Sequence, residues 1–215
     1  METYGELLAV EGLGHGFVTR VAGVDVGGAR DEMRERLWEN WVVELGALGF
    51  GESQLWTAGQ VHGARVEVVP QDVGGRKIAE TDGLVTGEAG VLLGIMVADC
   101  CAVYVVDPVV RACGLLHSGR KGSELGIAAA GIQKMEQMFG SDPADLLVRL
   151  SPCIRPPDFE VDFAAAIRDQ CVAAGVLARN VHDDGISTSA DLGRYYSYRM
   201  EKGRTGRMLA LLGFR

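Results

Sequence analysis

The stretch VLLGIMVADCCAVYVVDPVVRACGLLHSGRKG, residues 91–122, contains three short apolar runs rich in β-branched residues. The runs VLLGIMVAD, AVYVVD and RACGLLH are separated by polar residues at 99–101 and by the sequence DPVV. Continuous apolar runs of this length are typical of strands that are buried on both faces. The stretch therefore predicts three central strands, and the second and third are expected to form a hairpin through Asp107 and Pro108.

Helical periodicity flanks these strands. Residues 31–48 carry large apolar side chains at three- and four-residue spacing, which predicts an amphipathic helix. The same spacing returns over residues 123–139, where Ser123 is a candidate cap for the first turn. A further helix is predicted over residues 162–174.

Shorter strand signals complete the pattern. Residues 64–70 alternate apolar and charged side chains, residues 146–150 form an apolar run, and residues 194–214 predict two strands around a turn at Lys202 and Gly203. The total is about eight to ten strands and three or four helices. Because hairpins occur beside helices, we expect an α+β fold, a layered α/β sandwich with mixed sheets.

Composition limits the range of functions. A chain of 215 residues is long enough for one core, so we expect a single domain over residues 1–215. A net charge of −8 argues against nucleic acid as a partner. The five cysteines show no disulfide spacing, the N-terminus lacks a secretory pattern, and Asp99 interrupts the longest apolar run. We therefore expect a cytoplasmic location and no membrane span.

Three residues at strand ends are candidates for chemistry. Cys100 adjoins Asp99, and a charged group there needs a partner or a solvated cleft. His62 precedes a strand in GQVHG, and His117 ends a strand before a cationic turn. Two imidazoles and a thiolate suit tetrahedral zinc with an open fourth position. The remaining histidines, His15 and His182, are expected on the surface or as satisfied core residues, and Cys113 and Cys171 are expected as inert core residues.

Several motifs resemble one known family. GQVHG, TDGLVT, VADCCAVYVVDP, GLLHSGRKG, SPCIRPPDFEV and YYSYRMEKGRTGRMLALLG occur in the order of the YfiH or DUF152 family, also called the polyphenol-oxidase or laccase-domain family. HGFVTR, residues 15–20, resembles its N-terminal motif. The resemblance covers nearly the whole chain.

The resemblance implies a cytoplasmic α/β sandwich related to the cytotoxic necrotizing factor deamidases, with one zinc ion held by His62, Cys100 and His117. Members of the family have been assigned purine nucleoside phosphorolysis, adenosine deamination, methylthioadenosine phosphorolysis, copper-dependent phenol oxidation and editing of peptidoglycan precursors. With only four histidines in the chain, we set aside a multicopper site.

The chain departs from the family at its cationic turn. The usual HAGWRG is HSGRKG here, so Arg120 replaces a tryptophan and Lys121 replaces an arginine. Beside a helix start, Arg120 and Lys121 are candidates for phosphate binding, and Arg199 in YSYR is another.

Three hypotheses about function remain open. The first is a zinc-dependent purine nucleoside phosphorylase, with adenosine deamination as a second activity and Cys100, His117 and Asp99 as catalytic residues. The second is a metal-free hydrolase or deamidase in which Cys100 attacks and His117 is the base, or a peptidoglycan-precursor editing factor. The third is a non-catalytic protein that binds a small metabolite.

Overall fold

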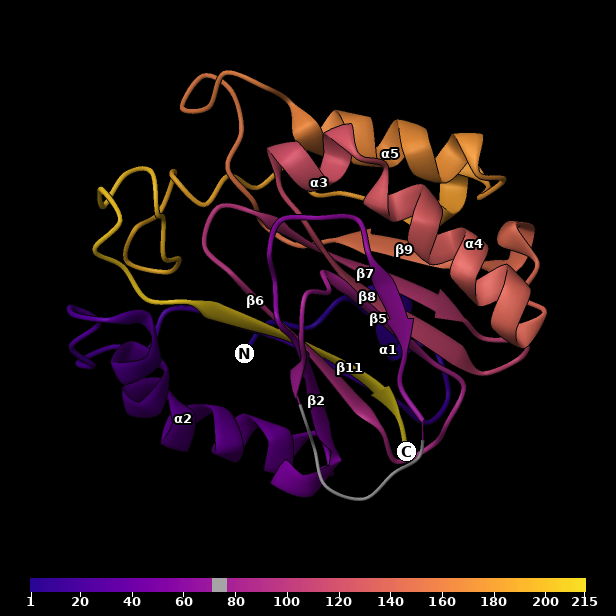
Figure 1. Ribbon diagram of the computed structural model, residues 1–215, viewed down its shortest axis with the longest axis horizontal. Coiled ribbons are helices and arrows are strands. Elements are labelled where there is room, and N and C mark those ends of the chain that lie inside the picture. The colour runs from indigo at the N-terminus through magenta and orange to yellow at the C-terminus, as the bar shows by residue number, and fades with distance from the viewer. Residues whose placement is uncertain (71–76) are drawn as a thin grey trace.

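The strands of the protein form two sheets in a computed structural model that describes residues 1–70 and 77–215 (Figure 1). Sheet A has the order β1–β11–β6–β2–β4, with bounds Leu13–Val18, Met208–Phe214, Leu92–Val97, Leu55–Ala58 and Lys77–Ile78. Sheet B has the order β10–β9–β7–β8–β5–β3, with bounds Val181–His182, Leu147–Leu150, Cys101–Asp107, Ala112–Ser118, Gly83–Thr86 and Val66–Val68. Each sheet combines parallel and antiparallel pairs.

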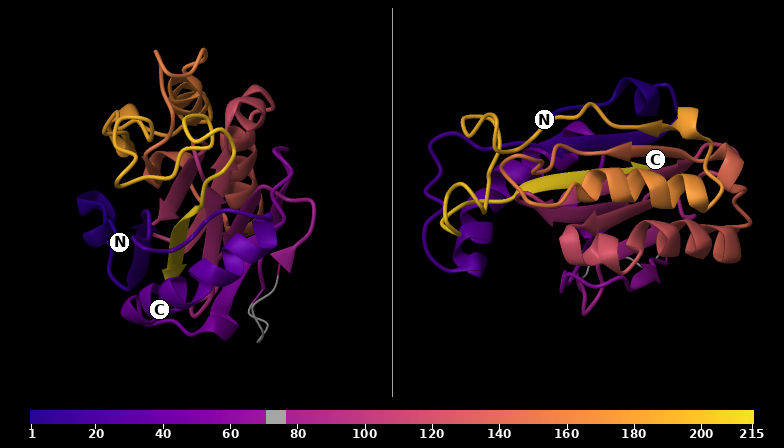
Figure 2. Two further views of the ribbon diagram at one scale, coloured as in Figure 1. Left: turned by 90° about the vertical axis from the view of Figure 1, so that its left-hand side faces the viewer. Right: turned by 90° about the horizontal axis from the view of Figure 1, so that it is seen from above.

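Helices cover the outer faces of both sheets (Figures 1 and 2). The long helix α2, Arg30–Ala47, packs against sheet A. On sheet B lie α4, Ile127–Phe139, and α5, Phe163–Ala173, with the short α3, Arg120–Glu124, beside them. A short α1, Gly5–Leu8, contacts β1, and three 3-10 turns span Glu52–Gln54, Pro143–Asp145 and Ala178–Asn180. The predicted layered α+β fold with mixed sheets is confirmed.

The central strands are apolar throughout because each of their two faces packs into a different hydrophobic core. In β11, Met208 and Ala210 point into the core between the sheets, whereas Leu209 and Leu211 pack under α2. Strand β7 divides in the same way: its even-numbered residues from Ala102 to Val106 face sheet A, and Val103 and Val105 face α4 and α5. Period-two alternation is therefore present, but both sets of side chains are apolar.

Several predictions from sequence are confirmed. Residues 92–97, 101–107 and 112–118 are buried strands, and the last two pair as an antiparallel hairpin with Asp107 opposite Ala112. The helices predicted over residues 31–48 and 162–174 are α2 and α5.

No helix in the described part of the chain has the length and apolar character needed to cross a bilayer. A single domain over residues 1–215 stands as a prediction.

The helix predicted over residues 123–139 is wrong in its first turn. Gly126 has a φ of +79°, a left-handed conformation that separates α3 from α4. Ser123 lies inside α3, where its hydroxyl donates to the Gly119 carbonyl at 2.8 Å, so it is not a helix cap. The cationic turn consequently forms a helix of its own.

Of the two strands predicted over residues 194–214, the second is confirmed as β11, and the first is wrong because no strand forms before it. The segment before it folds into turns. There the backbone amide of Ser197 and the hydroxyl of Thr205 both donate hydrogen bonds to Glu201 Oε2. The described residues contain eleven strands and five α-helices, more than predicted. The excess comes from very short elements such as β4 and β10, which are too brief for a sequence pattern.

Candidate metal centre

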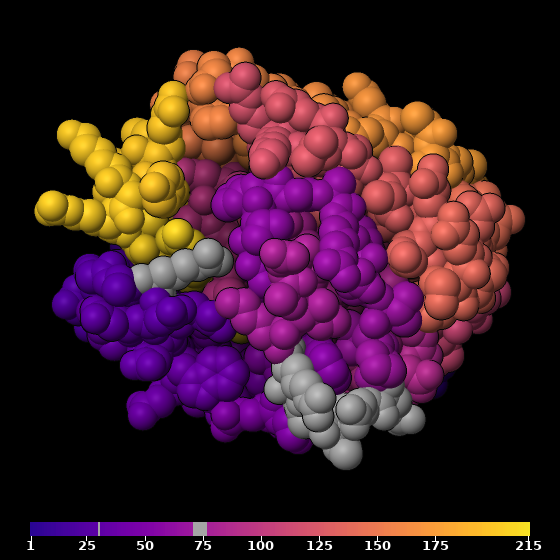
Figure 3. All heavy atoms as spheres, viewed as in Figure 1, coloured from indigo at the N-terminus to yellow at the C-terminus, as the bar shows by residue number. Residues whose placement is uncertain are grey.

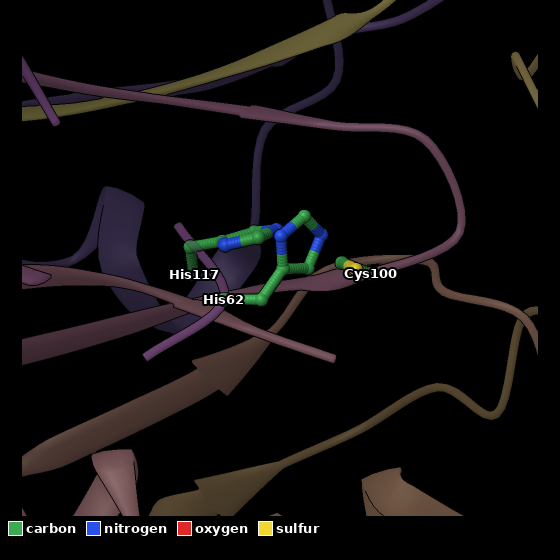
Figure 4. Close-up of side chains that lie close together, drawn as sticks. All are labelled: His62, Cys100 and His117. Carbon is green, nitrogen blue, oxygen red and sulfur yellow. The ribbon is translucent and has the colours of Figure 1, made fainter. Parts of the chain in front are cut away.

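Three side chains that are distant in sequence meet beside one end of sheet B: His62, Cys100 and His117 (Figure 4). Their ligand atoms all lie within 4.8 Å of one another. The two imidazole rings are edge to face, with centroids 4.9 Å apart and an interplanar angle of 71°. Within residues 1–70 and 77–215, no other group of three or more His, Cys, Asp or Glu side chains is arranged in this way.

The β7–β8 hairpin places two of these side chains next to each other. Cys101 pairs with Ser118, so the preceding Cys100 lies opposite Gly119. A Cβ atom added to Gly119 would stand only 2.5 Å from Cys100 Sγ, a distance at which the sulfur must move. The absence of a side chain at position 119 therefore leaves room for Cys100 Sγ in the place that it occupies in the cluster.

Asp82 organises both histidines. It is fully buried just before β5, and its Oδ1 accepts a hydrogen bond from His117 Nδ1 at 2.8 Å. The same carboxylate accepts hydrogen bonds from the backbone amides of Val61, His62 and Gly63 at 2.8–3.1 Å. His62 itself has a φ of +61°, a conformation that these three bonds support. Asp82 thus fixes the loop that carries His62 and leaves His117 Nε2 available to the cluster.

We did not predict a role for Asp82 from the sequence, although a signal was present. An aspartate directly before a buried strand, in TDG, must find partners for its charge. The partners come from segments that are distant in sequence, which the sequence pattern alone does not identify.

The electrostatics of the cluster favour a thiolate. Burial raises the pKa of Cys100, but hydrogen bonds with His117 and His62 outweigh it and lower the pKa to about 6. Burial lowers the pKa of His117, yet the hydrogen bonds with Asp82 and Cys100 raise it to about 9. A thiolate is the form of cysteine that binds metals and attacks electrophiles. In contrast, burial raises the pKa of both Cys113 and Cys171 to about 12, in agreement with a structural role.

Asp99 connects the cluster to the C-terminal segment. Its Oδ1 accepts a hydrogen bond from Thr188 Oγ1, and its Oδ2 accepts one from the Arg199 amide, each at 2.7 Å. Asp99 is buried with a φ of +78°, in the tight turn between β6 and β7. Both carboxylate oxygens are therefore engaged by the protein, as expected of a residue that positions its neighbours.

The cluster opens into a pocket of about 670 Å³. Its lining is in part aromatic and in part cationic, from Phe159, Phe163, Tyr198, Arg120, Arg199, Lys202 and Arg207. Several of these residues belong to the C-terminal segment, which stands out from the body of the molecule in yellow in Figure 3. Of the three predicted phosphate-binding residues, Arg120 and Arg199 line the pocket, whereas Lys121 is exposed on α3 and does not.

The fold and the cluster define a class of protein: a two-sheet α/β sandwich with a His–Cys–His centre in its pocket. The family described as multi-copper polyphenol oxidoreductase laccase matches residues 14–164 and 160–215. The chain belongs to this enzyme family, which includes the YfiH proteins.

Two relatives and one solved structure illustrate the family. The chain is 30% identical over 238 residues to a purine nucleoside phosphorylase of Streptomyces coelicolor, covering 95% of this chain and 96% of that protein. It is 33% identical over 233 residues to a purine nucleoside phosphorylase of Deinococcus radiodurans, covering 93% and 88%. The crystal structure of the hypothetical protein YfiH of Bacillus licheniformis superposes with a TM-score of 0.83 at 23% identity, covering 94% and 93%, which shows the shared fold.

Proposed function

We propose that this protein is a zinc-dependent purine nucleoside phosphorylase. The observation that carries the proposal is the His62–Cys100–His117 cluster at the base of a pocket with aromatic and cationic walls. Relatives named purine nucleoside phosphorylases that match nearly the whole chain support the same activity. A cytoplasmic location stands as a prediction.

The donor set fits zinc. His117 donates from Nδ1 to Asp82, as metal-bound histidines commonly do, and so presents Nε2 to the cluster. Three protein ligands of this kind leave a fourth position open. Zinc bound there would supply a Lewis acid that stabilises negative charge on an oxygen atom. The cluster holds donors for one ion, so we propose zinc in preference to a multicopper centre, despite the family's description.

The pocket offers groups for both halves of phosphorolysis. We assign the purine to the aromatic side chains Phe159 and Tyr198, and the phosphate to Arg120 and Arg199. In the reaction a phosphate oxygen bonds to C1′ of the ribose while the C1′–N bond breaks. The base leaves with the electron pair of that bond and takes up the proton that the phosphate loses on forming ribose 1-phosphate. Asp99, predicted among the catalytic residues, acts in this proposal by positioning Arg199.

A second candidate rests on the chain of contacts from Cys100 through His117 to Asp82. A thiolate, an imidazole and a buried carboxylate in this order are also the parts of a cysteine hydrolase or deamidase. In that case Cys100 attacks the substrate and bound zinc inhibits.

The experiment that separates them uses protein purified without a histidine tag or chelator. The metal content of wild-type protein and Cys100→Ala is measured first, followed by assays with adenosine and inosine in phosphate. About one zinc per chain, absent from the variant, with ribose 1-phosphate and free base as products supports the phosphorylase. Ammonia release from adenosine would add deamination. Zinc-loaded protein that turns over neither nucleoside contradicts the proposal.

A further inference from the structure

Glu160 joins two cationic side chains of the pocket. Its Oε1 lies 3.5 Å from Arg120 Nη1, and its Oε2 lies 3.0 Å from Arg199 Nη2. Arg120 begins α3, and Arg199 lies in the segment before β11, so one carboxylate links two distant parts of the pocket wall. Carboxylates and phosphates form the same charge-assisted bonds with guanidinium groups. A phosphate bound between the two arginines would therefore compete with Glu160 for both of them.

We propose that Glu160 sets the affinity of this pocket for phosphate. It is a resident anion that occupies the two guanidinium groups until phosphate displaces it. The inference rests on the proposed function, in which Arg120 and Arg199 bind phosphate, and it adds the residue that competes for them.

The exposure of these side chains makes displacement feasible. Glu160, Arg120 and Arg199 have side chains that are 51%, 52% and 54% exposed, and ion pairs at such positions are weak and open to competition. A deeply buried pair would instead resist an incoming anion because separating it leaves an unpaired charge.

Both arginines keep other contacts when Glu160 leaves. The guanidinium of Arg199 lies 5.4 Å from the centre of the Phe159 ring, and its backbone amide is held by Asp99. Arg120 Nε donates to Glu124 at 3.0 Å within α3. The two cations thus remain close to the positions from which they would bind phosphate.

The test compares Glu160→Gln with Glu124→Gln in the full chain, with inorganic phosphate as the titrant in calorimetry. Both variants remove one negative charge that contacts Arg120, but among the described contacts only Glu160 also binds Arg199. We expect Glu160→Gln to bind phosphate about fivefold more tightly than wild type, and Glu124→Gln to stay within about twofold. Adding Arg199→Gln to Glu160→Gln should remove the gain. Melting temperatures verify that each variant is folded.

Two results would overturn the inference: no gain in Glu160→Gln, or an equal gain in both variants, which would indicate a general charge effect. Glu160→Asp provides a second variant because it keeps the charge but is too short to bridge both arginines. It should bind phosphate more tightly than wild type, and weaker binding would count against the inference. Phosphate affinity needs no turnover. An affinity gain in a protein without phosphorolysis refutes the proposed function alone, whereas an active phosphorylase without the gain refutes the role of Glu160 alone.

Discussion

The carboxylate of Asp82 accepts a hydrogen bond from His117 at 2.8 Å and also holds the backbone of the loop that carries His62. One buried residue therefore orients two of the three proposed ligands. Carboxylates that orient a ligating imidazole fix its tautomer and raise its basicity.

We therefore expect Asp82→Asn to weaken zinc binding by about 10- to 100-fold. Competition with a chromophoric chelator measures the affinity. Asp107→Asn is the matched control because Asp107 is equally buried but lies at the far end of the β7–β8 hairpin, where it binds the amides of Val109 and Val110. Equal zinc affinity in Asp82→Asn and wild type would contradict the orienting role.

Gly119→Ala should damage the cluster sterically. The new methyl group would lie 2.5 Å from Cys100 Sγ, so the sulfur has to move away from the histidines. We expect less than one zinc per chain in metal analysis. Gly46→Ala is the control: Gly46 lies within α2 with nothing near its added Cβ, and alanine there stabilises a helix by up to about 1 kcal/mol. Full zinc occupancy in Gly119→Ala would show that the sulfur has room to shift.

Cysteine reactivity should differ sharply along the chain. Because its pKa is about 6, Cys100 is a thiolate at pH 7, whereas Cys113 and Cys171 have pKa values of about 12. Iodoacetamide should label Cys100 first in metal-free protein, as followed by peptide mass spectrometry. Saturating zinc should protect it. Labelling of Cys100 that is as slow as that of Cys113 would contradict the electrostatic picture.

Asp99→Asn should act on phosphate and leave zinc in place. Asparagine tolerates the positive φ at this position, but it removes the negative charge that holds the Arg199 amide. A hydrogen bond to a charged group contributes about 1.5–3 kcal/mol, so we expect phosphate affinity to fall by about tenfold or more. Calorimetry with phosphate and metal analysis are run on the same sample. Loss of zinc with phosphate binding intact would instead assign Asp99 to the metal centre.

Glu201 should make stability depend on pH. Its Oε2 binds Arg20 at 2.7 Å and accepts hydrogen bonds from the Ser197 amide and the Thr205 hydroxyl. Burial raises the pKa of Glu201, but these partners outweigh it and lower the pKa below its usual value. A lowered pKa means that the stabilisation is fully present above the unfolded value of about 4.3 and is lost as the pH falls through the folded value.

Urea unfolding of Glu201→Gln should therefore show a loss of about 1–2 kcal/mol at pH 7, and the difference from wild type should shrink below about pH 4. Glu35→Gln, an exposed position on α2, serves as the control and should lose little at either pH. A difference for Glu201→Gln that stays constant down to pH 3 would show that its charge is not responsible.

The sequence predicted the central strands well because their apolar runs are required by burial on both faces. It predicted the segment 194–203 as a strand because tyrosines favour strands, whereas hydrogen bonds to Glu201 fold that segment into turns. A family resemblance was the reason to expect the three proposed ligands close together. Their geometry depends on Asp82, whose partners lie in the loop at residues 61–63 and at the end of β8. Contacts between distant segments of this kind leave no local pattern in a sequence.

The pairing of Cys101 with Ser118 has a consequence for how the protein tolerates change. Cys100 and His117 occupy the open end of a hairpin whose connecting turn, near Val109 and Val110, is exposed at the opposite end. Insertions in that turn can lengthen the loop without altering the relation between the two ligands. A slip of the pairing by a single residue, by contrast, would turn one ligand toward the opposite face of the sheet and dismantle the centre. Insertions can thus be tolerated at the turn of the hairpin, whereas a change of register between its two strands cannot.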